Sequence, residues 1–178
     1  NAFLKLKKQG MKKLVLDLRG NGGGLMSEAV GIVSLFVPKG SLVVSSKGQA
    51  AGTEMHYKTT SEPLDTEIPI IVMVDSGSAS SSEIVTGALQ DLDRATVMGT
   101  RTFGKGLVQR QIPYSDGSAL RLTTARYYTP TGRSIQKPYT IGDDADYEED
   151  LWNRYRNNEF FSADSIHFAD SLKRTTPG

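Results

Sequence analysis

The chain has 178 residues, of which 38% are hydrophobic, which suffices for one globular domain with an apolar core. A formal net charge of +1 gives no electrostatic basis for binding nucleic acid or an anionic membrane, so we expect neither partner. The absence of cysteine excludes a disulfide framework and a thiolate metal site. No apolar run reaches the roughly 18 residues of a membrane span, and no signal peptide begins the chain, so we expect a piece of a longer precursor.

Apolar periodicity predicts alternating helices and strands from the first residue onward. In chain order we expect a helix at residues 2–9, a buried strand at 13–18, a helix at 25–37, and strands at 42–46 and 55–60. Residues 69–75 form the most apolar run, which indicates a strand buried on both faces. A helix at 80–92 and a strand at 95–99 follow, and residues 107–113 and 119–128 are typical of a hairpin.

This order predicts an α/β fold with βαβ crossovers. The composition changes after Pro138, so we divide the chain into a core at residues 1–138 and an extension at residues 139–178. The extension is polar, with helices expected at 147–158 and near 163–173. No motif in it indicates a role.

A glycine-rich turn at residues 20–24 follows the first predicted strand and opens a helix. A dinucleotide-binding turn would need glycine where Leu25 stands, and an acidic residue about 20 positions on, which is missing. The turn is either a tight bend that needs positive φ or a set of bare N–H groups facing a developing negative charge.

A second glycine-rich segment, residues 99–106, is similar to a phosphate-binding P-loop. Gly106 stands where a P-loop carries the Ser or Thr that binds magnesium, and the next segment is a predicted strand rather than a helix. Both differences argue against a nucleotide phosphatase.

Ser80 stands at a predicted strand-to-helix junction, within the run GSASSSE at residues 77–83. As the first residue of a capping box with Glu83, Ser80 could serve only to cap the helix. Alternatively, its hydroxyl could act as a nucleophile while the N–H of Ser81 binds the oxyanion. The neighbouring Ser78, Ser81 and Ser82 leave the nucleophile open at this point.

Lys105 lies between two glycines, which allow the backbone to pass close to another segment and the ammonium to turn inward. A lysine acts as general base only when neutral, so burial must lower the pKa of such a lysine from about 10.4 toward roughly 7–8. Gln109, four residues on, could hold the amine without adding a charge. The alternatives are a solvated loop lysine and an ordinary exposed strand glutamine. The two histidines of the chain, His56 and His167, lie outside any motif.

Four segments resemble the carboxy-terminal processing proteases, or tail-specific proteases, in the order typical of that family. They are LDLRGNGGG at residues 16–24, GSASSSEIVTGALQD at 77–91, TFGKGLVQ at 102–109 and YYTPTGRSIQ at 127–136. The resemblance implies a serine endopeptidase that cleaves proteins near their C-termini by acyl-enzyme chemistry, without metal or cofactor. It also implies a crotonase-like or ClpP-like spiral of βαβ units and a location in the bacterial periplasm or cell envelope.

The resemblance assigns a role to each matching position. Ser80 becomes the nucleophile, Lys105 the general base and Gln109 the residue that orients the lysine. The N–H groups of Gly24 and Ser81 form the oxyanion hole, with Gly23 as the neighbouring candidate. Position 81 is more often alanine in this family, so its serine adds a hydroxyl that the mechanism does not require.

The chain also departs from the family pattern. A PDZ domain that grips the substrate's C-terminal tail usually precedes this core, and residues 139–178 match nothing in the pattern. We therefore expect polypeptide substrates, a full-length protein with a PDZ domain, a possible homo-oligomer and a segment that is poorly active alone. Two rival hypotheses are an acyl-CoA enzyme of the crotonase fold and a catalytically inactive peptide-binding module.

Overall fold

The computed structural model describes residues 2–139 and 149–160. The helices are α1 (Ala2–Lys8), α2 (Met26–Ser34), α3 (Ser81–Asp91) and α5 (Asp150–Arg156). The strands are β1 (Leu14–Asp17), β2 (Leu42–Lys47), β3 (Met55–Lys58), β4 (Ile70–Val74), β5 (Thr96–Gly99), β6 (Leu107–Pro113) and β7 (Ala119–Tyr128). The elements expected within residues 2–128 are all present, each within a few residues of its predicted bounds.

The strands form two sheets of different character. A parallel sheet has the order β1-β4-β5, and an antiparallel sheet has the order β3-β2-β7-β6. β4, the strand expected to be the most buried, is central in the parallel sheet, where Val72 pairs with Leu16 on one side and Val97 on the other. Helix α3 connects β4 to β5 and so completes a βαβ crossover. The chain therefore has the mixed α/β fold that its sequence pattern predicts.

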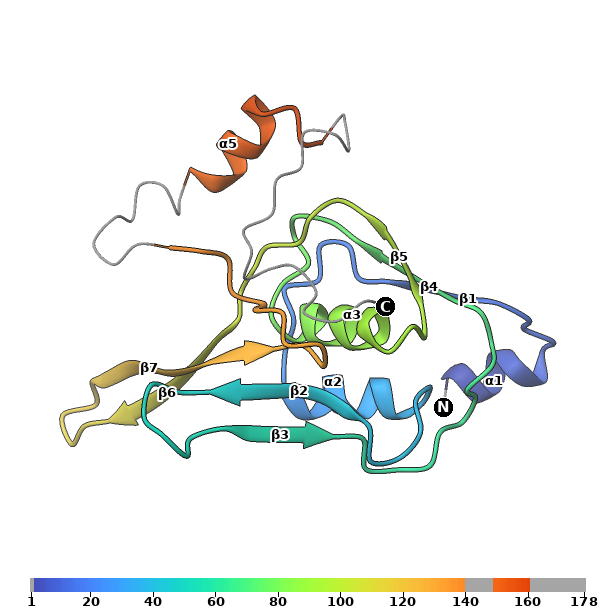
Figure 1. Ribbon diagram of the computed structural model, residues 1–178, viewed down its shortest axis with the longest axis horizontal. Coiled ribbons are helices and arrows are strands. Elements are labelled where there is room, and N and C mark those ends of the chain that lie inside the picture. The colour runs from blue at the N-terminus through green and yellow to red at the C-terminus, as the bar shows by residue number, and fades with distance from the viewer. Residues whose placement is uncertain (1, 140–148, 161–178) are drawn as a thin grey trace.

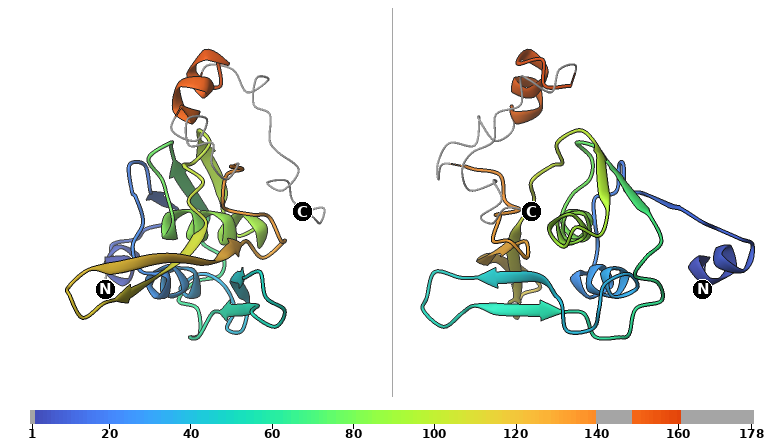
Figure 2. Two further views of the ribbon diagram at one scale, coloured as in Figure 1. Left: turned by 90° about the vertical axis from the view of Figure 1, so that its left-hand side faces the viewer. Right: turned by 45° about the vertical axis from the view of Figure 1, so that its right-hand side comes forward.

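Helices α2 and α3 pack against each other, and α3 also contacts β2 and β5, one strand from each sheet. Figure 1 shows both helices beside the antiparallel sheet, and the right-hand view of Figure 2 looks nearly along their axes. Apolar side chains from these layers form one core, whose largest fully buried members are Val33, Val43, Val44, Val72, Ile84 and Leu89. The core holds the start of α3 in place, which matters because Ser80 lies there.

The hairpin of β6 and β7 extends away from this core (Figure 1). Its strands pair from Leu107 opposite Arg126 to Pro113 opposite Ala119, and most of their side chains are exposed. A register shift between Val108 and Gln109 marks a β-bulge near the base of the hairpin. Such bulges bend a strand and change the direction of its side chains.

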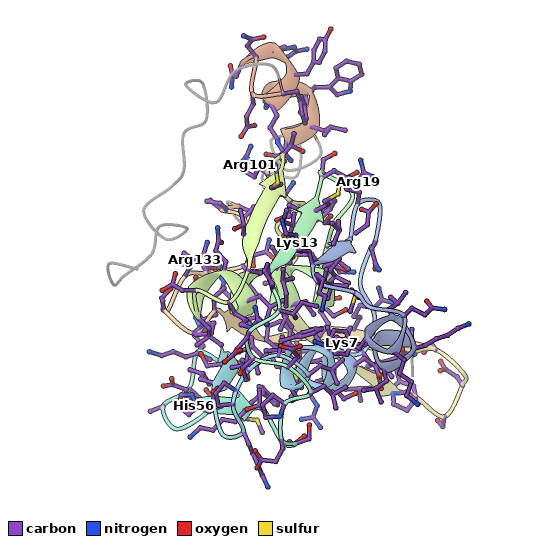
Figure 3. All side chains as sticks on the ribbon, turned by 90° about the vertical axis from the view of Figure 1, so that its right-hand side faces the viewer. Lys7, Lys13, Arg19, His56, Arg101 and Arg133 are labelled. Carbon is purple, nitrogen blue, oxygen red and sulfur yellow. The ribbon has the colours of Figure 1, made fainter. Side chains whose placement is uncertain are left out.

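Helix α5 falls inside the first helix predicted for the extension, whereas the second predicted helix lies outside the described residues. Charged groups join α5 and the turn after it to the core. Arg101, just beyond β5 (Figure 3), donates to the Glu159 carboxylate at 2.8 Å, and the buried Arg154 donates to the carbonyl oxygen of Arg101. No helix within residues 2–139 and 149–160 is long and apolar enough to cross a membrane.

Candidate active site

Ser80 occupies a strained turn between β4 and α3. Its φ of 58° and ψ of −120° make it one of three non-glycine residues with positive φ among the described residues. This conformation is costly for an L-residue, and such strain clusters at functional sites. Ser80 and Glu83 form the capping box expected from the sequence, in which the Glu83 side chain accepts the Ser80 N–H, and the Glu83 N–H also donates to the Ser80 carbonyl oxygen at 2.9 Å. An N-cap residue usually has β-region backbone angles, so capping alone does not account for the strained conformation of Ser80.

Glu83 joins the nucleophile turn to the lysine loop. Its Oε2 accepts the N–H of Ser80 and the N–H of Lys105, both at 2.8 Å. Its Oε1 accepts the Thr102 hydroxyl at 2.7 Å and the Gly104 N–H at 2.6 Å. Burial raises the pKa of Glu83 even though these four donors favour the carboxylate. One oxygen thus fixes the backbones of both proposed dyad residues.

The sequence alone gave Glu83 only a capping role. Its side chain does contact the Ser80 N–H, as a capping box requires. The additional bonds reach residues 19 to 22 positions later in the chain, and no local pattern encodes them. The signal available in the sequence was a glutamate in the first turn of the predicted helix, three residues after a candidate nucleophile.

The glycine turn packs directly on the start of α3. Gly23 has a φ of +91°, and a Cβ on it would lie 2.6 Å from the Ala79 carbonyl oxygen and 2.8 Å from the Ser81 nitrogen. The Gly24 N–H donates to the Ser81 hydroxyl at 2.6 Å. Since Ser81 is the first residue of the helix, its own N–H has no intrahelical acceptor. The structure thus brings together both N–H groups expected to form the oxyanion hole.

Asp75, directly after β4, holds this turn from the other side. Its Oδ1 accepts the Gly20 N–H at 2.8 Å and the Gly77 N–H at 2.9 Å. The bond from Gly20 is the largest cause that lowers the pKa of Asp75. The Ser78 hydroxyl donates to the Leu18 carbonyl oxygen at 2.7 Å and accepts the Asp75 N–H at 3.0 Å. Ser78 therefore joins β1 to β4, which gives it a structural role and argues against it as the nucleophile.

The two glycines beside Lys105 allow the close backbone approach that the sequence predicts. A Cβ on Gly104 would lie 2.7 Å from Lys137 Cβ, and one on Gly106 would lie 2.3 Å from the Gln136 nitrogen. The Gly106 N–H donates to Gln136 Oε1 at 2.9 Å, and the Lys137 N–H donates to the Gly104 carbonyl oxygen at 3.0 Å. The fourth sequence motif thus forms the wall behind the lysine loop.

The burial expected for the Lys105 ammonium is not found. Lys105 is exposed, and within the described residues its side chain forms no hydrogen bond with Ser80. The loop lies at the base of the exposed β6–β7 hairpin, so the described residues place no layer over it. The structure therefore joins the backbones of Lys105 and Ser80 through Glu83, while the described residues show no hydrogen bond between the two side chains.

Gln109 also differs from its expected contact. It is exposed, and its amide nitrogen donates to the Thr123 hydroxyl at 3.4 Å, with no hydrogen bond to Lys105 among the described residues. The bulge after Val108 places Gln109 opposite Thr123 and accounts for this bond. The position of Gln109 on the strand that follows Lys105 is nonetheless the predicted one.

Asp91 anchors the last motif to the far end of α3. Its carboxylate accepts the Thr131 N–H at 3.0 Å, the Thr131 hydroxyl at 2.6 Å and the Arg133 guanidinium at 2.5 Å. Burial alone would raise the pKa of Asp91, but hydrogen bonds from threonine side chains and the charge of Arg133 outweigh it and lower the pKa. Asp91, Glu83 and Asp75 are site-forming carboxylates that the sequence did not reveal.

A cavity of about 310 Å³ adjoins this framework. Glu83, Gly104 and Arg133 contribute to its lining, whereas Ser80 and Lys105 do not. It therefore lies behind the proposed dyad and not over it. Among residues 2–139 and 149–160, no cluster of three or more histidine, aspartate or glutamate side chains is arranged to hold a metal ion.

Comparisons with known proteins point to the same family that the four motifs resemble. The family model of "Peptidase family S41" matches residues 1–147. A carboxy-terminal-processing protease of Bartonella bacilliformis is 47% identical over 152 residues, which are 85% of this chain and 35% of that protein. A chloroplastic C-terminal processing peptidase of Tetradesmus obliquus is 44% identical over 136 residues, or 76% of this chain and 29% of that protein.

Among solved structures, the photosystem II D1 C-terminal processing protease superimposes with a TM-score of 0.69 at 40% identity. The match covers 76% of this chain and 34% of that structure. The chain thus spans about a third of the length of these relatives. The breadth of the family match and the similarity to curated relatives show that this chain belongs to peptidase family S41.

Proposed function

We propose that this chain is the catalytic core of a serine endopeptidase that cleaves polypeptides near their C-termini, with Ser80 as nucleophile and Lys105 as general base. The observation that carries this proposal is the Glu83 carboxylate oxygen that accepts the backbone N–H of both residues. A shared acceptor holds the two turns together, which keeps the backbone of Lys105 close to that of Ser80. The names of the similar proteins, which are C-terminal processing proteases, support the same activity.

In this reaction the Ser80 oxygen attacks the carbonyl carbon of the scissile peptide bond while its proton passes to neutral Lys105. The carbonyl oxygen becomes an oxyanion, which the N–H groups of Gly24 and Ser81 bind. Lys105 then protonates the leaving amine as the C–N bond breaks. Water then attacks the carbonyl carbon of the acyl-enzyme while neutral Lys105 takes its proton. Lys105 returns this proton to the Ser80 oxygen as the ester bond breaks, which restores Ser80.

Gln109 would orient Lys105 once the lysine side chain turns toward Ser80. We also propose that the complete protein forms a crotonase-like spiral of βαβ units, carries a PDZ domain for C-terminal tails and works in the bacterial periplasm or cell envelope. We propose in addition that the complete protein forms a homo-oligomer. These statements extend the family resemblance to the whole protein.

A serine-reactive fluorophosphonate with intact-mass and peptide analysis tests the dyad on residues 1–178. We expect one adduct, on Ser80, and none in Ser80→Ala. Lys105→Arg should react as poorly as Lys105→Ala, because a guanidinium stays protonated in proteins. Ser82→Ala, which removes a neighbouring hydroxyl, is the matched control and should react like the parent. Labelling of Ser80→Ala at the parental rate, or a reactive arginine variant, would refute the proposal.

The same probe separates the two rival functions. An acyl-CoA enzyme of the crotonase fold would not need Ser80 and Lys105 together, and the similarity to named proteases does not favour it. An inactive peptide-binding module would bind peptide without labelling at any serine.

A further inference from the structure

The Ser81 side chain takes up one of the two proposed oxyanion donors. The Gly24 N–H donates to Ser81 Oγ at 2.6 Å, a short contact in a partly buried place, and Ser81 itself is 9% exposed. A peptide N–H carries a single hydrogen, and hydrogen bonds weaken steeply away from linear geometry. The Gly24 N–H therefore cannot bind this hydroxyl and an oxyanion with full strength at the same time.

The backbone leaves the glycine turn little freedom to escape from this contact. Gly23 sits so close to the start of α3 that even a Cβ would lie within 3 Å of three atoms of residues 79–81. Gly20 is held by the Asp75 carboxylate at 2.8 Å, and the Gly23 N–H donates to Asn21 Oδ1 at 2.9 Å. The movable partner is the Ser81 hydroxyl, which can leave Gly24 by rotation about χ1.

The other donor needs no such rearrangement. The Ser81 N–H is at the first position of the helix and has no intrahelical acceptor, so it is free to bind an oxyanion. The Ser81 hydroxyl thus occupies one donor of the proposed oxyanion hole, whereas the Ser81 N–H supplies the other donor.

We propose that the Ser81 hydroxyl is a placeholder for the oxyanion, which occupies the Gly24 N–H in the free protein and must rotate away before Ser80 reacts. This inference rests on the proposed function, because it assumes that Ser80 is the nucleophile. Its consequence is that Ser81 slows acylation, so removing the hydroxyl activates the site. The acylation step is otherwise unchanged: Ser80 attacks the carbonyl carbon of the substrate while its proton passes to Lys105.

The test compares the full chain with Ser81→Ala, Ser81→Thr and the control Ser82→Ala, whose hydroxyl has no hydrogen bond to Gly24. The first readout is hydrogen exchange of the Gly24 amide by NMR, which requires no turnover. We expect exchange about five- to tenfold faster in Ser81→Ala, as one lost hydrogen bond implies, and unchanged in the other two variants. Unchanged exchange in Ser81→Ala would refute the hydrogen bond.

The second readout is the second-order rate constant for fluorophosphonate labelling of Ser80. We expect it to rise about five- to tenfold in Ser81→Ala and to stay parental in the control Ser82→Ala. An equal or lower rate in Ser81→Ala would overturn the placeholder role. If Ser80 is unreactive in every chain, the proposed function fails, and the Gly24 exchange rate alone then decides whether the hydroxyl occupies the donor.

Discussion

Glu83→Gln tests whether one buried carboxylate holds the site together. The carboxylate receives two donors on each oxygen: Ser80 and Lys105 on Oε2, and Thr102 and Gly104 on Oε1. A glutamine offers one oxygen and one NH₂ group, so whichever way it turns, one pair of donors meets another donor.

The less costly orientation leaves the NH₂ group facing Thr102 and Gly104. The Thr102 hydroxyl can then accept instead of donate, and only the Gly104 N–H is left without a partner. One buried donor without a partner costs about 1–3 kcal/mol. Glu83 is 6% exposed, so solvent does little to reduce this cost. The opposite orientation leaves two backbone N–H groups unpaired, at about twice the cost.

We therefore expect Glu83→Gln to lower the free energy of unfolding by about 1–3 kcal/mol. With a urea m-value of about 2 kcal/mol per molar, the midpoint of unfolding falls by about 0.5–1.5 M. Far-UV circular dichroism in urea measures this shift. Glu62→Gln is the matched control because Glu62 is exposed, and it should stay within about 0.5 kcal/mol of the parent. A parental midpoint for Glu83→Gln would refute the view that these four bonds fix the site.

Two further variants probe the turn and the far end of α3. Gly23→Ala should lose about 1–3 kcal/mol of stability through backbone strain and lose Ser80 labelling, because its Cβ meets the Ala79 carbonyl oxygen at 2.6 Å. Gly22→Ala, with nothing within 4 Å of its Cβ, is the control, and equal labelling of the two variants would contradict the argument. Since the folded-state pKa of Asp91 is lowered, its stabilisation is present above about pH 4 and is lost as the pH falls through the folded-state pKa. Urea unfolding should show Asp91→Asn less stable than the parent by about 1–3 kcal/mol at pH 7, with a smaller gap near pH 3, and a gap independent of pH would disprove this.

Local patterns in the sequence determined most of the core. The apolar run around β4, the helical period after Ser80 and the turn between β6 and β7 each encode their own element, because backbone geometry and burial act over a few residues. The glycines beside Lys105 likewise indicated a close backbone approach, which Gln136 and Lys137 confirm. For residues 139–178 the pattern predicts only two helices, of which the first contains α5 and the second lies outside the described residues.

Contacts between distant segments decided the rest. Gly24 and the Ser81 hydroxyl are 57 positions apart, and only the packing of the glycine turn on α3 brings them to 2.6 Å. The bond from Glu83 to the lysine loop depends in the same way on α3 and the loop lying side by side. Lys105 is exposed because the described residues place no layer over the base of the β6–β7 hairpin. Short-range periodicity in the sequence carries no information about such a layer. The sequence by itself determined which residues could form the site, whereas tertiary packing decided which atoms meet, because hydrogen bonds depend on positions in space and not on spacing along the chain.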